Sequence, residues 1–194
     1  DYLEKKSITP KAYDVLKEAV KNRKNIVVVG GTGSGKTTFA NALVSELNGS
    51  HDRILVLEDL PELQIKAEDV VFMCTSSHVT MRDLVKGSLR MRPDRIIIGE
   101  VRDGAALELL KAWNTGHPGG ICTIHANSAE SAPYRFEDLL QEVVITVPRN
   151  LILQAIDMIA FIERDKEGHR NLKELVSLDG YDEINKAYLF KSLL

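Results

Sequence analysis

Short apolar runs recur along the chain, and between them lie longer segments in which apolar residues return at helical spacing. The runs that predict buried strands are residues 26–29, 54–57, 70–74, 95–100 and 121–125. The helical patterns are expected to start at Thr9–Pro10, near Gly35, at Thr80, at Asp103 and at Ser128. Strands that alternate with helices are typical of a parallel sheet covered by helices on both faces. The pattern therefore predicts an α/β fold.

The last part of the chain has a different pattern of predicted elements. A short helix is expected after Pro148, and three strand-like segments follow it, at residues 158–162, 172–178 and 188–190. The turn-forming residues 165–168 and 180–182 separate these segments, which is a hairpin signal. We therefore expect an antiparallel ribbon added to the parallel sheet. The helix from Thr80 is expected to run to Met91, and the helix from Ser128 to about Val144.

A glycine-rich loop directly follows the first predicted strand. It reads G-G-T-G-S-G-K-T-T and fits the P-loop pattern G-x-x-x-x-G-K-[ST]. Glycines allow backbone N–H groups to converge on a phosphate, and the positive end of the next helix points to the same place. Lys36 is expected to contact the β- and γ-phosphates of ATP and Thr37 to ligate Mg²⁺. The predicted nucleotide-binding residues are Gly30, Gly31, Thr32, Gly33, Ser34, Gly35, Lys36, Thr37 and Thr38.

Carboxylates follow two other predicted strands. Glu100 comes directly after the apolar run 96–98, and Glu58, Asp59 and Glu62 come after the run 54–57. Open α/β sheets bind ligands at the carboxyl ends of their strands, so both groups are expected beside the phosphate loop. We predict that Glu100 is a catalytic residue and a metal ligand, and that Glu58 or Glu62 positions the attacking water. The alternative for the second group is a solvated loop.

His125 closes the strand-like run 121–124 and is expected at the same edge of the sheet. A neutral imidazole there could hydrogen-bond the γ-phosphate or the water, which makes His125 a candidate catalytic residue. The alternative is a loop histidine with a structural role. His117 precedes Pro-Gly-Gly and is expected in a flexible linker.

Arginines gather between the third strand and the segment just after Glu100. They are Arg82, Arg90, Arg92, Arg95 and Arg102. Because no acidic run accompanies them, some are expected to face anions, and the planar guanidinium suits a phosphoryl group. We select Arg90 and Arg102 as candidate nucleotide-binding residues, one of which could act on a neighbouring subunit. The alternative is that these arginines are solvated charges on helix faces.

Bulk properties exclude several classes of function. The 194 residues carry a net charge of −3, so there is no electrostatic signature of nucleic-acid binding. No apolar run approaches the ~18 residues that a membrane span needs. Cys74 and Cys122 lie in apolar runs and are expected to be buried reduced thiols, as in a cytosolic protein. The chain begins with Asp1 in a charged segment, which suggests a piece of a longer protein.

The motifs together resemble those of the secretion ATPase superfamily, whose members power type II and type IV secretion and pilus machines. The resemblance rests on the P-loop, an acidic box, a segment that ends in Glu100 and Arg102, and a histidine box. These motifs occupy residues 30–38, 57–63, 89–102 and 115–128. The segments around 110–113 and 141–149 are most similar to TrbB-type conjugal-transfer ATPases.

The resemblance implies a RecA-like C-terminal ATPase domain, here residues 9–194, with residues 1–8 as the remnant of an N-terminal domain or linker. It implies ATP and Mg²⁺ as ligands, a homo-hexameric ring, and other secretion-system subunits as partners. It also implies a cytoplasmic location, peripheral at the inner membrane. By motif match, Lys36 and Thr37 hold phosphates and Mg²⁺, Glu100 is the Walker B acid, and His125 senses the γ-phosphate.

Three alternative functions stay open from the sequence. A pilus assembly or retraction ATPase belongs to the same superfamily, although a four-cysteine zinc insert is excluded because the chain has two cysteines. A nucleotide-gated interaction module would bind ATP with little turnover. A small-molecule P-loop kinase would need an acceptor pocket and a lid, which no motif indicates.

Overall fold

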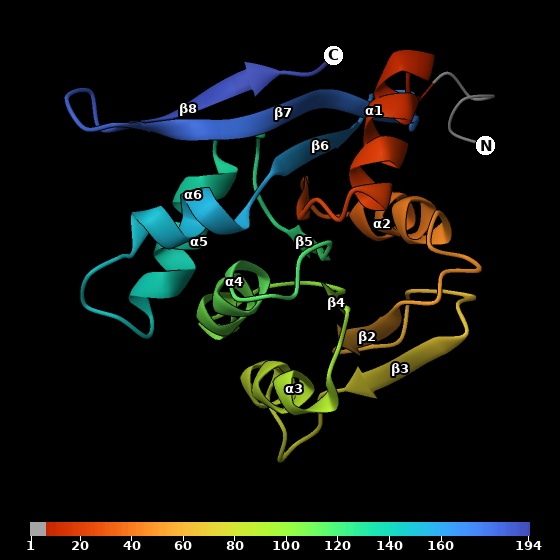
Figure 1. Ribbon diagram of the computed structural model, residues 1–194. Helices are drawn as coiled ribbons and strands as arrows, with labels where there is room; N and C mark the ends of the chain where they lie inside the picture. Colours follow the sequence, from red (N-terminus) through yellow and green to blue (C-terminus); the bar gives the residue numbers. More distant parts are fainter. Residues whose placement is uncertain (1–6) are drawn as a thin grey trace.

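The computed structural model describes residues 7–194, which form one eight-stranded sheet with the order β3-β2-β4-β5-β1-β6-β7-β8 (Figure 1). Strands β1 to β6 are parallel, and β7 and β8 continue the sheet as an antiparallel ribbon. The strands are β1 (Ile26–Val29), β2 (Arg53–Glu58), β3 (Asp69–Cys74), β4 (Arg95–Ile98), β5 (Ile121–Ile124), β6 (Met158–Arg164), β7 (Arg170–Asp182) and β8 (Ala187–Ser192). The predicted fold class is confirmed.

Helices cover both faces of the sheet (Figure 1). One face carries α1 (Pro10–Lys21) and α2 (Lys36–Ser45). The other carries α3 (Met81–Ser88), the 3₁₀ turn η1 (Leu89–Met91), α4 (Ala105–Asn114), α5 (Ala132–Gln141) and α6 (Arg149–Ala155). Neighbouring residues of β1 point to opposite faces, so Val27 and Val29 belong to one core and Ile26 and Val28 to the other. Burial on both faces explains why these strands are uniformly apolar.

Two predicted helix starts are confirmed by their caps. The Thr9 hydroxyl accepts a hydrogen bond from the Ala12 N–H, with Pro10 at the first helical position. Thr80 and Asp83 form a reciprocal capping box at the start of α3. These caps satisfy N–H groups that the first turn of a helix leaves without a partner.

Several predicted element ends were wrong. Helix α3 ends at Ser88 rather than Met91, because residues 89–91 tighten into a 3₁₀ turn and Arg92 takes φ 53°. Helix α5 is shorter than residues 128–144, since Ser128 and Ser131 bond each other in a loop before it. Strand β7 runs through Gly180, which lies at a bulge, and the turn comes after Asp182.

The prediction that both cysteines are buried is half wrong. Cys122 is fully buried in β5, and burial raises the pKa of its thiol far above the usual range. Cys74 is exposed on β3, which is an edge strand of the sheet and therefore has a side not covered by a neighbouring strand. Periodicity marked the strand correctly but could not show its place at the edge.

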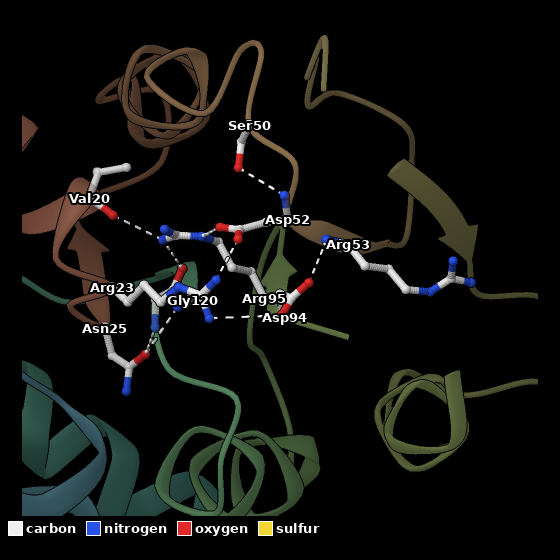
Figure 2. Close-up of polar contacts among 10 residues, drawn as sticks. Val20, Arg23, Asn25, Ser50, Asp52, Arg53, Asp94, Arg95 and Gly120 are labelled. Carbon is white, nitrogen blue, oxygen red and sulfur yellow. Dashed lines mark hydrogen bonds and ion pairs between the residues drawn. The ribbon is translucent and has the colours of Figure 1, made fainter. Parts of the chain in front are cut away.

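A buried polar network lies at the sheet edge opposite the phosphate loop, where strands β1, β2 and β4 begin (Figure 2). Arg95 Nε is 2.6 Å from Asp52 Oδ2, and Arg23 Nη2 is 2.5 Å from Asp52 Oδ1. Nη1 of Arg95 also donates to the carbonyls of Val20 and Gly119. Burial alone would raise the pKa of Asp52, but the hydrogen bond and charge of Arg95 and the charge of Arg23 hold it below 3.8.

Asp52→Asn is expected to lower the free energy of unfolding by about 3–5 kcal/mol, because it leaves the Arg95 charge buried without its partner. The folded-state pKa of Asp52 lies below its unfolded value of 3.8, so this contribution is complete above that pH and is lost as the pH falls further. Urea denaturation near neutral pH and below pH 3.8 measures both effects. Asp138→Asn on an exposed part of α5 is the matched control, expected to change stability little. A penalty no larger than the control's would contradict this assignment.

The N-terminal residues bear on the predicted domain boundary between residues 8 and 9. Residues 1–6 lie outside the described residues, so most of the predicted remnant at 1–8 does too. Ser7 and Ile8 are buried, and the Ser7 carbonyl accepts a hydrogen bond from the Leu172 N–H of β7. In the part of the chain that the structure describes, no helix has the length and apolar character to span a membrane.

Candidate nucleotide-binding site

The strand order brings four segments, distant in sequence, to one edge of the sheet. Strands β2, β4, β5 and β1 are neighbours and run parallel, so their carboxyl ends lie in a row. Glu58 ends β2, Glu100 follows β4, His125 follows β5, and the P-loop follows β1. These segments line one cavity of about 220 Å³. Its lining residues are Thr32, Gly33, Lys36, Thr37, Glu58, Asp59, Leu60, Glu62, Gly99, Glu100, Arg102, Thr123 and His125.

The P-loop takes the conformation that its glycines allow. Gly33 and Gly35 have φ values of 73° and 96°, in the left-handed region that other residues rarely adopt. At Gly30 a Cβ atom would lie 2.4 Å from the Ile162 carbonyl oxygen of β6, so a side chain cannot fit there. Helix α2 begins at Lys36, and its first N–H groups have no intrahelical partner and face the loop.

Lys36 is almost buried at the centre of the site, with 8% of its surface exposed. Its Nζ donates to the Gly31 carbonyl at 3.1 Å and lies 3.4 Å from both ring nitrogens of His125. Burial lowers the pKa of the ammonium below its usual 10.5, and the nearby Glu100 carboxylate opposes this shift. The Lys36 side chain is therefore held within the loop and close to two of the other predicted catalytic groups, Glu100 and His125.

Glu100 and His125 contact each other directly. Nε2 of His125 is 2.7 Å from Oε1 of Glu100, and Nε of Arg102 is 3.8 Å from Oε2. Arg102 also forms an ion pair with Asp59, whose other oxygen accepts the Thr75 hydroxyl at 2.8 Å. The prediction that His125 projects from the same edge as Glu100 agrees with this geometry.

The two other predicted carboxylates differ in their surroundings. Glu58 is 3% exposed, and its Oε1 accepts the N–H groups of Glu62 at 3.0 Å and Leu63 at 2.9 Å. That oxygen therefore holds the loop after β2 in place, which is a structural role independent of any role in positioning water. Glu62 is exposed at the cavity wall, and its side chain has no hydrogen bond or ion pair within residues 7–194. Both stay candidates for positioning water.

The donor groups of the cavity fit a nucleotide with Mg²⁺. In the P-loop beside the cavity, the Ser34 hydroxyl oxygen is buried without a hydrogen-bond partner among the described residues, although buried polar groups are normally paired. Within residues 7–194, no cluster of three or more His, Cys, Asp or Glu residues could hold a metal ion alone. Mg²⁺ needs none, because it is usually bound through one or two protein groups, water and phosphate oxygens. Thr37 and Glu100 supply such groups in this cavity.

Only one of the two arginines predicted to bind the nucleotide lies at the cavity in the described structure. Arg102 lines the cavity, whereas Arg90 is exposed and does not. Although no acidic run accompanies these arginines in the sequence, three of them pair with single carboxylates from distant segments: Arg82 with Glu108, Arg95 with Asp52, and Arg102 with Asp59. His117, expected in a flexible linker, is half-buried and its Nδ1 lies 2.9 Å from the Pro93 carbonyl oxygen.

Sequence reasoning missed Thr123, whose hydroxyl donates to the Gly99 carbonyl at 2.7 Å beside the cavity. It also missed Leu60, which is 73% exposed at the rim. Thr38, predicted to bind the nucleotide with the rest of the P-loop, does not line this cavity but a neighbouring one.

Comparison with known proteins identifies the family of the chain. A family described as "Type II/IV secretion system protein" matches residues 2–165. The chain belongs to this family. The conjugal transfer protein TrbB from Rhizobium radiobacter is 49% identical to this chain over 183 residues, which is 93% of the chain and 56% of that protein. The type IV secretion system protein VirB11 from Bartonella quintana is 36% identical over 187 residues, covering 90% of the chain and 51% of that protein.

A solved structure of the secretion family has the same fold. The VirB11 ATPase of the Brucella suis type IV secretion system, crystallised in complex with sulphate, superimposes with a TM-score of 0.79 at 30% identity. The match covers 88% of the chain and 56% of that structure. The predicted resemblance to secretion ATPases, and to the conjugal-transfer type among them, is confirmed. The chain spans about half the length of the relatives it matches.

Proposed function

We propose that this protein is a Mg²⁺-dependent ATPase subunit of a bacterial conjugative type IV secretion system. The observation that carries the proposal is the meeting of Lys36, Glu100 and His125 in one cavity with the P-loop. A phosphate loop by itself binds nucleotide, but hydrolysis also needs groups that place the metal and the water. This cavity brings both kinds of group together.

Each residue has a role that its position supports. The P-loop N–H groups and Lys36 bind the phosphates, with the ammonium directed to the γ end beside Glu100 and His125. Mg²⁺, when bound through Thr37 and Glu100, neutralises charge on the β- and γ-phosphates. Glu58 or Glu62 orients the water for in-line attack, and His125 hydrogen-bonds the γ-phosphate or that water. Arg102 balances the charge of Asp59 and Glu100 at the rim.

The biological setting is supported by relatedness. Relatives at 49% and 36% identity are named for conjugal transfer and type IV secretion. We place the protein as a homo-hexamer on the cytoplasmic face of the inner membrane, where hydrolysis drives substrate transfer or pilus assembly with other secretion subunits. In such a ring, Arg90, which is exposed and outside the cavity, is available to a neighbouring subunit.

Phosphate release from ATP tests the proposal. We expect saturable turnover that requires Mg²⁺ and disappears when a chelator removes it. Calorimetric titration with a non-hydrolysable ATP analogue, done in parallel, measures binding separately. Binding without any phosphate release would contradict the assignment as an ATPase and would favour a nucleotide-gated interaction module.

A further inference from the structure

One cationic side chain beside the P-loop comes from the C-terminal ribbon. Arg170 begins β7, and its Nη1 lies 3.3 Å from the Thr38 hydroxyl in the first turn of α2. Its aliphatic part passes close to Gly35, where an added Cβ would lie 2.5 Å from Arg170 Cδ. The Arg170 side chain therefore lies across the end of the phosphate loop, at the start of the helix.

Arg170 lacks the carboxylate partner that most arginines have in the described part of the chain. Arg82, Arg95 and Arg102 each pair with a carboxylate. Arg170 is exposed and has no acidic partner among residues 7–194, where its one polar contact is the Thr38 hydroxyl. It also lies beside the positive end of α2, which disfavours a cation unless an anion binds there. A nucleotide phosphate bound at the P-loop would be such an anion.

Neighbouring residues of α2 show which part of the nucleotide Arg170 would meet. Thr37 lines the cavity that contains Glu100 and His125, where the γ-phosphate is proposed to lie. Thr38 lines instead a second cavity of about 590 Å³ between α1 and α2, with Tyr13 and Phe39 in its wall. If the γ-phosphate lies in the first cavity, we expect the α-phosphate and the nucleoside to extend past Thr38 toward the second cavity. That is the side on which Arg170 lies.

We propose that Arg170 binds the α-phosphate side of the nucleotide, so that the C-terminal ribbon contributes directly to the nucleotide site. This inference rests on the proposed function, since it takes the γ-phosphate to lie at Lys36 and Glu100. The guanidinium would exchange its contact with Thr38 for charge-assisted hydrogen bonds to phosphate oxygens. Arg170 is then a binding residue, and both ADP and ATP need it.

The test is calorimetric titration of the chain with Mg-ADP and with a non-hydrolysable Mg-ATP analogue. Arg170→Met is expected to weaken both by the same factor, about 10- to 100-fold, because the lost charge-assisted bonds are common to the two ligands. Arg170→Lys is expected to recover part of the lost affinity, since lysine keeps the positive charge but lacks the planar guanidinium with its paired donors. Lys166→Met, at the tip of the same hairpin, removes one exposed positive charge and is the matched control, expected to bind normally.

The outcomes separate this inference from the proposed function. If Arg170→Met binds as tightly as Lys166→Met while the unmodified chain binds both nucleotides, the inference is wrong and the nucleotide site stands. If only the ATP analogue is affected, the placement on the α side is wrong. If the unmodified chain binds neither nucleotide, the proposed function itself fails. Melting temperatures without nucleotide, equal in all variants, exclude misfolding as the cause.

Discussion

Lys36→Ala is expected to reduce ATP turnover by about 10²- to 10³-fold or more, which is the usual cost of removing one preorganised charge that stabilises a transition state. The Lys36 ammonium is almost buried, lies within the loop, and has the Glu100 carboxylate near enough to oppose the lowering of its pKa. It is therefore positioned before the nucleotide arrives. Binding of the ATP analogue is expected to weaken as well, because the ground state also contacts this cation. Steady-state phosphate release and calorimetry measure the two effects.

Lys21→Ala is the control for this prediction. Lys21 is exposed in the last turn of α1 and has no hydrogen bond or ion pair within the described part of the chain. Its loss is expected to leave turnover unchanged. Turnover in Lys36→Ala close to that of the control would show that hydrolysis takes place without the P-loop lysine, and the assigned site would then be wrong.

Glu100→Gln is expected to separate binding from hydrolysis. The amide keeps the size of the side chain and can still hydrogen-bond His125, but it removes the negative charge that lies near Lys36 and that we propose also binds Mg²⁺. We expect turnover to fall by about 10²- to 10³-fold while the ATP analogue still binds within about tenfold of the original affinity. The readouts are kcat from phosphate release and Kd from calorimetry.

The matched control is Glu130→Gln, which makes the same chemical change at an exposed position outside the cavity. It is expected to leave both kcat and Kd unchanged. A Glu100→Gln variant that keeps its turnover would remove Glu100 from the catalytic groups. The metal and the water would then have to be placed by Glu58 or Glu62.

Much of this site could be predicted because its residues follow strands of a parallel sheet. The run 26–29 leads into Gly30, the run 96–98 into Glu100, and the run 121–124 into His125. In such a sheet the carboxyl ends of all strands reach one edge, so position after a strand already indicates the neighbourhood. The same reasoning could not give strand order, which decides that β5 lies between β4 and β1.

The parts that could not be predicted depend on contacts between distant segments. Arg95 looked like a candidate for anion binding, but it pairs with Asp52, 43 residues away in sequence, in a buried network. Arg170 gave no signal at all, because it lies 132 residues from Thr38 and reaches the P-loop only when β6 and β7 complete the sheet. Cys74 was misjudged for the same reason, since the edge of a sheet is defined by strand order.

The central claim is that the P-loop, Glu100 and His125 gather around one Mg-nucleotide. The most direct measurement is a crystal structure with a non-hydrolysable ATP analogue and Mn²⁺ in place of Mg²⁺, with the metal located by its anomalous scattering. We predict the metal beside the Thr37 hydroxyl and the γ-phosphate within hydrogen-bond reach of Lys36. A metal peak or a γ-phosphate on another face of the sheet, away from Lys36 and Glu100, would contradict the account.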